Sequence, residues 1–356
     1  MSHRRLLIRC DAAPKIGFGH VVRCLALADT MREHHGWQVD FAMMIGEIGF
    51  SQVHAKGYAI YRAPRENLSG VEEGDWLCQV VTNSKPDVLL LDVRTYLTTS
   101  AVQSIRESGV LIVTIDDPSE RRLVADLAFY PPVPQVEQMD WTGFAGERYV
   151  GWEWVLLRPE FAQAREKKLQ ELPRPKNSSP RILVTMGGSD PAGFTLTVLK
   201  ALDTLQEDFS VCVVLGNGFL HDQELNDWLK TAQRTYTIKR NVTDMAEVMI
   251  EAEIAVISFG VTAYELATIG VPTIYLCLSE DHAESASALD KAGFGLNLGF
   301  YRQETQNNLI KEMHRLIYNH HNIHLKNIKY SKKEKKHGTM LVASIINKKK
   351  SEYNKT

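Results

Sequence analysis

The chain has 356 residues, a formal net charge of -2 and 44% hydrophobic residues. This length is enough for two domains of ordinary size, and the composition is that of a soluble globular protein. The near-zero charge gives no general attraction to nucleic acid, and no apolar run is long enough to cross a membrane. The start of the sequence lacks a signal-peptide core and the cysteines form no CxxC pair, so we expect a cytoplasmic protein with buried free thiols.

Strand and helix patterns alternate along the chain, which predicts an α/β fold with parallel sheets. In the first half, strands are expected near residues 4–10, 37–44, 87–92 and 110–115. Asp92 and the pair Asp116 and Asp117 follow two of these strands, at the edge where open α/β sheets bind ligands.

The turn after the first strand is the most informative feature of the sequence. Asp11 ends the strand, and Gly17-Phe18-Gly19-His20 leads into a helix. Glycine permits positive φ and close approach of a ligand, and the free N–H groups of a helix start suit an anion. The helix dipole disfavours a charged imidazole, so His20 is expected to be neutral near pH 7 and able to accept a proton. The pattern fits neither the dinucleotide fingerprint nor the P-loop, and a tight turn with an incidental surface histidine is the alternative.

A stretch rich in charge, proline and serine divides the chain, and we place the domain boundary there. The expected divisions are a first Rossmann-like domain over 1–165, a linker over 166–180, a second Rossmann-like domain over 181–325 and a lysine-rich tail over 326–356. Further strands are expected near 182–185, 210–215, 253–257 and 273–278. Two such domains with a cleft between them are typical of the GT-B architecture of nucleotide-sugar enzymes, here an analogy. The tail is interpreted as solvated, with weak attraction to an anionic membrane surface as the alternative.

A second glycine turn lies in the second domain. Ser258, Gly260 and Thr262 mark the start of a helix after a buried strand, where hydroxyl and N–H groups can hold a diphosphate. Glu265 lies one turn into that helix and can accept both hydroxyls of a ribose. A carboxylate that only stabilises the helix dipole is the alternative for Glu265.

Two further segments of the second domain are candidates for nucleotide contacts. Gly188 and Ser189 form a turn after the strand at 182–185, which can bind phosphate or simply cap the next helix. The loop with Thr243 and Met245 can offer backbone groups to a flat base, although methionine at such a position is more often a core residue.

Taken in order, these segments resemble the UDP-2,4-diacetamido-2,4,6-trideoxy-β-L-altropyranose hydrolases of pseudaminic acid biosynthesis and related spore-coat polysaccharide proteins. The resemblance rests on Asp11 with residues 16–24 and on residues 115–117, 156–161, 186–191 and 258–265. It implies a GT-B fold related to the glycosyltransferase of peptidoglycan lipid II synthesis. It also implies that water cleaves a UDP-sugar at the anomeric carbon without a metal or cofactor, with His20 as the catalytic histidine. The segments 243–245 and 258–265 would bind UDP, and Gly17, Gly19 and Arg23 are assigned to substrate binding.

The chain departs from this family at two places. Asp281 and His282 stand where the family usually has Asn-Gln, and these side chains would contact the sugar. Arg94 stands where the family tends to have a tyrosine, and Tyr96 follows two residues later. An ionised carboxylate only accepts hydrogen bonds whereas an amide also donates, so the preferred sugar can differ.

The expected reaction is hydrolysis of a UDP-linked amino or deoxy sugar with inversion. His20 would take the proton of the attacking water, and Asp11 would orient His20 or serve only as a turn residue. An inverting GT-B glycosyltransferase and an inactive nucleotide-sugar binding protein are the alternatives. A metal enzyme built on Asp116 and Asp117 is disfavoured, because few other oxygen ligands are near in sequence. The sequence leaves the sugar and the oligomeric state open.

Overall fold

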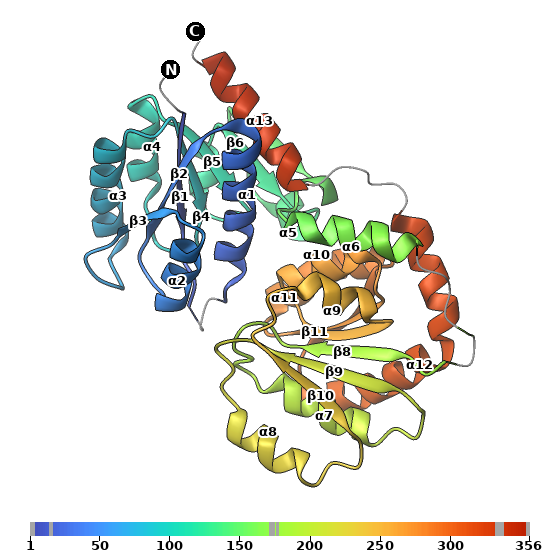
Figure 1. Cartoon of the computed structure of the whole chain (residues 1–356). Coiled ribbons are helices and arrows are strands. Elements are labelled where there is room, and N and C mark those ends of the chain that lie inside the picture. The colour runs from blue at the N-terminus through green and yellow to red at the C-terminus, as the bar shows by residue number, and fades with distance from the viewer. Residues whose placement is uncertain (1–3, 14–16, 171–174, 176–177, 332–337, 354–356) are drawn as a thin grey trace. The chain divides into compact units, whose positions relative to one another are not determined.

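The computed structural model describes residues 4–13, 17–170, 175, 178–331 and 338–353, without the side chains of 303–304 and 320–331 (Figure 1). It divides into two compact units. The first contains the chain up to Arg158 together with the last helix, Gly338–Tyr353. The second contains the chain from Pro159 to the helix before it, Gln303–Ser331. Each unit is a parallel sheet with helices, as the alternating pattern predicts.

The first domain is built on a seven-stranded sheet of order β3-β2-β1-β4-β5-β6-β7. Its strands are β1 (Arg5–Cys10), β2 (Gln38–Met43), β3 (Ala59–Arg62), β4 (Val88–Asp92), β5 (Leu111–Ile115), β6 (Leu127–Tyr130) and β7 (Glu147–Val150). Its α-helices are α1 (Gly19–His35), α2 (Glu47–Ala55), α3 (Gly70–Ser84), α4 (Thr99–Glu107), α5 (Pro134–Gln138) and α13 (Gly338–Tyr353), with short 3-10 helices at Glu120–Val124 and Trp152–Trp154.

The central strands of this sheet are buried on both faces, which explains their continuous apolar sequences. One face packs against α1, α2 and α13, and the other packs against α3 and α4. Strands β1, β2, β4 and β5 lie where the sequence predicts strands, whereas β3, β6 and β7, each only four residues long, were not predicted.

Helix α13 corrects the expectation of a solvated lysine-rich tail. Val342, Ala343 and Ile346 are fully buried in the core of the first domain, on the same face as α1. The Thr339 hydroxyl accepts from the Leu157 N–H at 2.9 Å, which ties the helix to the end of the first segment. Lys348–Lys350 lie on this helix, and Lys332, Lys333, Lys335 and Lys336 lie outside the described residues.

The second domain contains a six-stranded parallel sheet of order β10-β9-β8-β11-β12-β13. Its strands are β8 (Arg181–Thr185), β9 (Ser210–Leu215), β10 (Tyr236–Arg240), β11 (Ile254–Ser258), β12 (Thr273–Cys277) and β13 (Gly295–Phe300). Its helices are α6 (Pro159–Gln170), α7 (Phe194–Asp203), α8 (Asp222–Leu229), α9 (Met245–Glu251), α10 (Val261–Ile269), α11 (Glu280–Lys291) and α12 (Gln303–Ser331).

Helix α6 lies where the sequence analysis expects the end of the first domain and the start of a linker. Phe161 and Ala164 are buried, and the Lys168 ammonium donates to the carbonyls of Ile250 and Ala252 at 2.9 and 2.6 Å. The division between the domains therefore falls at Arg158 rather than near 165. The charges at 165–168, which suggested the start of a linker, belong to a helix that packs against α9 and α10 within the second domain.

In each sheet, successive strands are added first toward one edge and then toward the other, and this switch occurs at one pair of neighbouring strands. These pairs are β1 and β4 in the first domain and β8 and β11 in the second. Ligands bind beyond the carboxyl ends of such strands in open α/β sheets. All five cysteines are free thiols, and no helix among the described residues is long and apolar enough to span a membrane.

Candidate functional site

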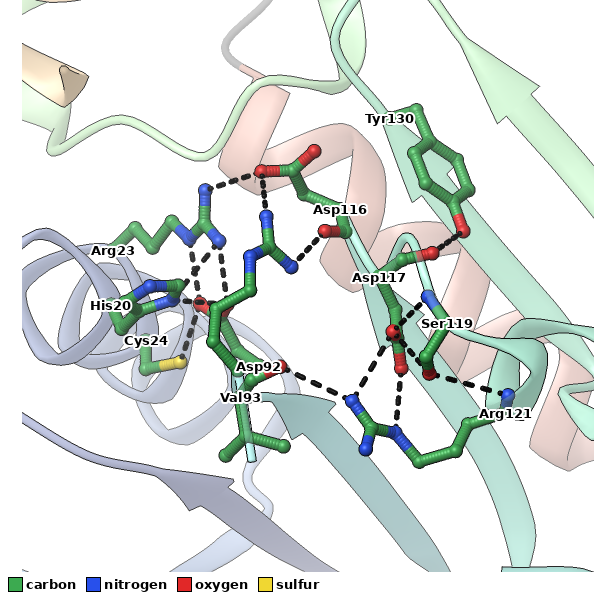
Figure 2. Close-up of polar contacts among 11 residues, drawn as sticks. His20, Arg23, Cys24, Asp92, Val93, Asp116, Asp117, Ser119, Arg121 and Tyr130 are labelled. Carbon is green, nitrogen blue, oxygen red and sulfur yellow. Dashed lines mark hydrogen bonds and ion pairs between the residues drawn. The ribbon is translucent and has the colours of Figure 1, made fainter. Parts of the chain in front are cut away.

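His20 and Asp92 meet at the switch point of the first sheet. His20 is the second residue of α1, which follows β1, and Asp92 ends β4. The parallel register pairs Cys10 with Asp92, so the two strand ends lie side by side. His20 Nδ1 lies 2.6 Å from Asp92 Oδ1, and Figure 2 shows the imidazole directed at the carboxylate.

Arg23 fixes the Asp92 carboxylate from the next turn of α1. Its Nε donates to Oδ2 at 2.6 Å and its Nη2 donates to Oδ1 at 2.5 Å. The carboxylate is fully buried, and burial alone raises the pKa of the carboxyl. The charges and hydrogen bonds of Arg23 and His20 outweigh burial and hold the pKa of Asp92 well below its usual range. The guanidinium of Arg23 thus pairs with carboxylates, and its assignment to substrate binding stays a prediction.

The carboxylate determines which nitrogen of His20 carries the proton. An ionised carboxylate only accepts, so Nδ1 must donate to Asp92, and the 3.2 Å approach of Arg23 Nη2 to Nδ1 is then a neighbouring contact without a hydrogen bond. Among the described residues none bonds to Nε2. The side chain of His20 is 17% exposed, so Nε2 can accept a proton from a water molecule.

The glycine turn before His20 has the expected local structure. Gly17 has a φ of 81° and donates its N–H to the Ala13 carbonyl at 2.8 Å. Gly19 is the first residue of α1, and Phe18 before it provides no side-chain cap. Within the described residues, no side chain caps the first N–H groups of this helix.

Asp11 does not orient His20, which corrects one of the two roles considered for it. Its Oδ1 accepts from the N–H groups of Met44 at 2.6 Å and Ile45 at 3.0 Å, and its Oδ2 lies 2.7 Å from Arg9 Nη1. These bonds anchor the loop after β2. Gly46 in that loop lies so close that a Cβ would be 1.5 Å from the Ala12 carbonyl oxygen. Asp11 is thus a turn residue.

Asp116 and Asp117 both follow β5, but they form ion pairs with different arginine side chains. Asp116 Oδ2 accepts from Arg94 Nη2 at 2.9 Å and lies 3.6 Å from Arg23 Nη1. Asp117 is buried, and its carboxylate accepts from Arg121 Nε at 2.9 Å and from the Ser119 N–H at 2.9 Å. Figure 2 shows the two carboxylates directed apart, so they do not form a shared metal site.

In the second domain, glycine turns gather at the switch point of the sheet. A Cβ on Gly187, after β8, would lie 3.8 Å from the hydroxyl of Ser258, which ends β11. Gly188 packs under the turn after β9, where a Cβ on Gly216 would lie 2.5 Å from the Gly188 carbonyl oxygen. The sequence analysis did not identify the turn at Gly216, although its Gly-Asn-Gly sequence after a strand is a turn signal.

The helix starts on either side of this point differ in their capping. Gly260 precedes α10 without a side-chain cap, and Thr262 is half-buried in the first turn of that helix. Asp190 instead accepts from the N–H groups of Phe194 and Thr195, both at 2.8 Å, and thereby caps α7. The neighbouring Ser189 is buried. Gly260 therefore provides no side-chain cap for α10, whereas the start of α7 is occupied by Asp190.

The remaining predicted contacts occupy the same edge of the second sheet. Met245 is half-buried at the start of α9 and Thr243 is exposed before it. Glu265 is 4% exposed on α10. Asp281 is exposed in the first turn of α11, and His282 beside it packs its ring 6.0 Å from Phe259, next to Ser258. Burial lowers the pKa of His282, with Asp281 opposing the shift.

Sequence comparisons match one family model and several relatives. Residues 181–341 match the glycosyltransferase family 28 C-terminal domain. The chain is 28% identical over 78% of its length to the uncharacterised protein MJ1062 of Methanocaldococcus jannaschii, of which the match covers 56%. It is 23% identical to the spore coat polysaccharide biosynthesis protein SpsG of Bacillus subtilis, over 87% of this chain and 88% of the relative. It is also 23% identical to the UDP-2,4-diacetamido-2,4,6-trideoxy-beta-L-altropyranose hydrolase of Campylobacter jejuni, over 82% and 97%.

Solved structures confirm the predicted fold class. MurG of Acinetobacter baumannii superposes with a TM-score of 0.71 at 17% identity, covering 97% of this chain and 99% of that one. The UDP-GlcNAc 2-epimerase of Neisseria meningitidis, solved with UDP-GlcNAc bound, superposes with a TM-score of 0.60 at 13% identity and covers 97% and 99%. The chain therefore has two Rossmann-like domains of the GT-B fold.

Proposed function

We propose that this protein hydrolyses a UDP-linked amino or deoxy sugar at the anomeric carbon and releases UDP and the free sugar. His20 acts as the general base. Its Nε2 removes a proton from water, the water oxygen bonds to the anomeric carbon, and the bond from that carbon to the diphosphate oxygen breaks. Attack from the face opposite UDP inverts the configuration, and the proton on His20 then passes to solvent.

The observation that carries this proposal is the His20–Asp92 pair at the switch point. Asp92 holds the proton on Nδ1 and leaves Nε2 as an acceptor, and Arg23 holds the carboxylate in place. A carboxylate also stabilises the imidazolium that forms when the water loses its proton. A positioned base of this kind contributes about 10²–10⁴-fold to the rate.

UDP is a stable leaving group, so the reaction needs stabilisation of the diphosphate rather than a strong acid. We assign this role to the second domain, where Ser258, Gly260 and Thr262 surround the uncapped start of α10. The helix dipole at the start of α10 favours the developing negative charge. The bound UDP-GlcNAc of the epimerase with the same fold and the UDP-sugar name of the Campylobacter hydrolase support a UDP-sugar as substrate.

Incubation of the protein with a panel of UDP-sugars, followed by NMR, tests the proposal. We expect UDP and a free sugar of inverted configuration without any added acceptor. His20→Asn should lower the rate at least 100-fold, whereas His54→Asn, a change at an exposed histidine of α2, should not change it. Release of UDP by His20→Asn at the wild-type rate would refute the role of the base.

An inverting glycosyltransferase is the second candidate, because the second domain matches the glycosyltransferase family 28 C-terminal domain. The same base would then deprotonate an acceptor hydroxyl instead of water. UDP release would depend on the acceptor, and the same NMR experiment with and without added sugars separates the two reactions. Tight UDP binding without turnover of any sugar would instead favour a binding protein.

A further inference from the structure

Arg94 and Asp116 form an ion pair at the carboxyl edge of the first sheet. Arg94 lies two residues after β4, and Asp116 lies directly after β5. Arg94 Nη2 donates to Asp116 Oδ2 at 2.9 Å, and Arg94 Nη1 donates to the main-chain carbonyl of Asp116. Two bonds from one guanidinium to one residue hold both side chains in a defined geometry.

The side chain of Arg23 links this pair to the proposed base, His20. Arg23 touches both groups, because its Nη1 lies 3.6 Å from Asp116 Oδ2 and its Nη2 lies 3.2 Å from His20 Nδ1. Figure 2 shows His20, Asp92, Arg23 and Asp116 joined in one group of polar contacts. Arg23 and Asp92 thus connect the pair to the proposed base, and we expect a sugar ring that reacts at His20 to come within reach of Asp116.

The exposure of the side chains rises from the base toward the pair. It is 0% for Asp92, 17% for His20, 27% for Asp116 and 39% for Arg94. Within the part of the chain that the structure describes, Asp116 Oδ1 and Arg94 Nε have no hydrogen-bond partner. The pair thus presents a free acceptor and a free donor to a ligand, which matches the hydroxyl and acylamino groups of a sugar.

The charges of this cluster are balanced. The guanidiniums of Arg23 and Arg94 face the carboxylates of Asp92 and Asp116, and the neighbouring Asp117 is paired with Arg121. No cation of the cluster is left for an additional carboxylate, and Asp116 would repel one.

We propose that Arg94 and Asp116 determine specificity for the sugar of the nucleotide sugar, and that the charge of Asp116 excludes acidic sugars. Arg94 donates to the sugar and Asp116 accepts from it. This inference rests on the proposed function for the identity of the ligand. Hydrogen bonds to charged groups imply that loss of Arg94 weakens sugar binding about 10–100-fold.

Calorimetric titration of the protein with UDP, UDP-N-acetylglucosamine and UDP-glucuronate tests this proposal. Wild type should bind UDP-N-acetylglucosamine more tightly than UDP-glucuronate. Arg94→Ala should weaken UDP-N-acetylglucosamine about 10–100-fold with UDP unchanged. Asp116→Asn should strengthen UDP-glucuronate relative to UDP-N-acetylglucosamine, because it leaves a cation uncompensated.

Arg65→Ala is the matched control, since Arg65 forms an exposed pair with Glu72 in the same domain. It should leave all three affinities unchanged. Unchanged ratios in both Arg94→Ala and Asp116→Asn would overturn the inference, as would a wild type that binds no UDP-sugar more tightly than UDP. Because the test measures binding, altered ratios together with no turnover of any UDP-sugar in the NMR panel would uphold the pair and refute the hydrolase. Turnover with unchanged ratios would uphold the hydrolase and refute the role of the pair.

Discussion

Replacement of Asp92 by Asn separates the two tasks of this carboxylate, which holds a buried arginine and orients the proposed base. The variant removes the charge opposite Arg23, whose side chain is only 14% exposed. Leaving one partner of a buried pair uncompensated costs about 3–5 kcal/mol, and the amide oxygen keeps one of the hydrogen bonds, so about 3 kcal/mol is expected. The loss of the oriented tautomer should lower the rate of UDP release about 10²–10⁴-fold.

The stability loss should depend on pH in a defined direction. Burial raises the pKa of Asp92, but Arg23 and His20 lower it further, so the pKa in the folded state lies below that in the unfolded chain. The pair therefore stabilises the fold fully above the ordinary Asp pKa of about 3.9 and progressively less as the pH falls below it. Urea unfolding at several pH values should show the difference between wild type and Asp92→Asn shrinking below about pH 4.

Asp117→Asn is the control for this experiment. Asp117 is equally buried and pairs with Arg121 through two nitrogens, at 2.9 and 3.2 Å, but does not touch His20. It should lose similar stability while keeping the rate of UDP release, compared at equal folded fraction. If both variants lost activity equally, Asp92 would have no role beyond the fold and the assignment of the base would fail.

Three further predictions concern other parts of the molecule. Gly216→Ala should weaken UDP binding at least 10-fold in calorimetry. The new Cβ would lie 2.5 Å from the Gly188 carbonyl oxygen and displace that turn. An unchanged affinity would show that the turn does not take part in UDP binding. Deletion of α13 should unfold the first domain at a lower urea concentration than wild type, since Val342 and Ile346 are fully buried, and an unchanged midpoint would contradict that packing. UDP release should be unaffected by EDTA, whereas loss of activity restored by a divalent cation would contradict the metal-free reaction.

The strands that are buried on both faces were predictable, because continuous apolar runs bounded by turn residues need no knowledge of distant neighbours. The same holds for the turn that leads to His20. The partner of His20 was not predictable in this way, because Asp92 is distant in sequence and is placed beside it by the register of β1 with β4. Asp11 was the nearer carboxylate in sequence, but its oxygens bind Met44, Ile45 and Arg9 instead.

The errors at the domain boundary and the C-terminus have one cause. Lysines and prolines were interpreted as signs of solvated chain, yet α6 buries the stem of Lys168 and α13 buries Lys350. Long charged side chains can cover apolar surface while the ammonium reaches a carbonyl or carboxylate. The apolar residues of α13 recur at helical spacing, and this signal would have identified the helix.

The return of the chain to the first domain has a consequence for biosynthesis. Val342, Ala343 and Ile346 belong to the core around α1, but they are synthesised after every segment of the second domain. A growing polypeptide usually completes its N-terminal domain before the following one. Here the order is reversed: the second domain has all its segments first, and the N-terminal Rossmann unit stays incomplete until α13 has been synthesised.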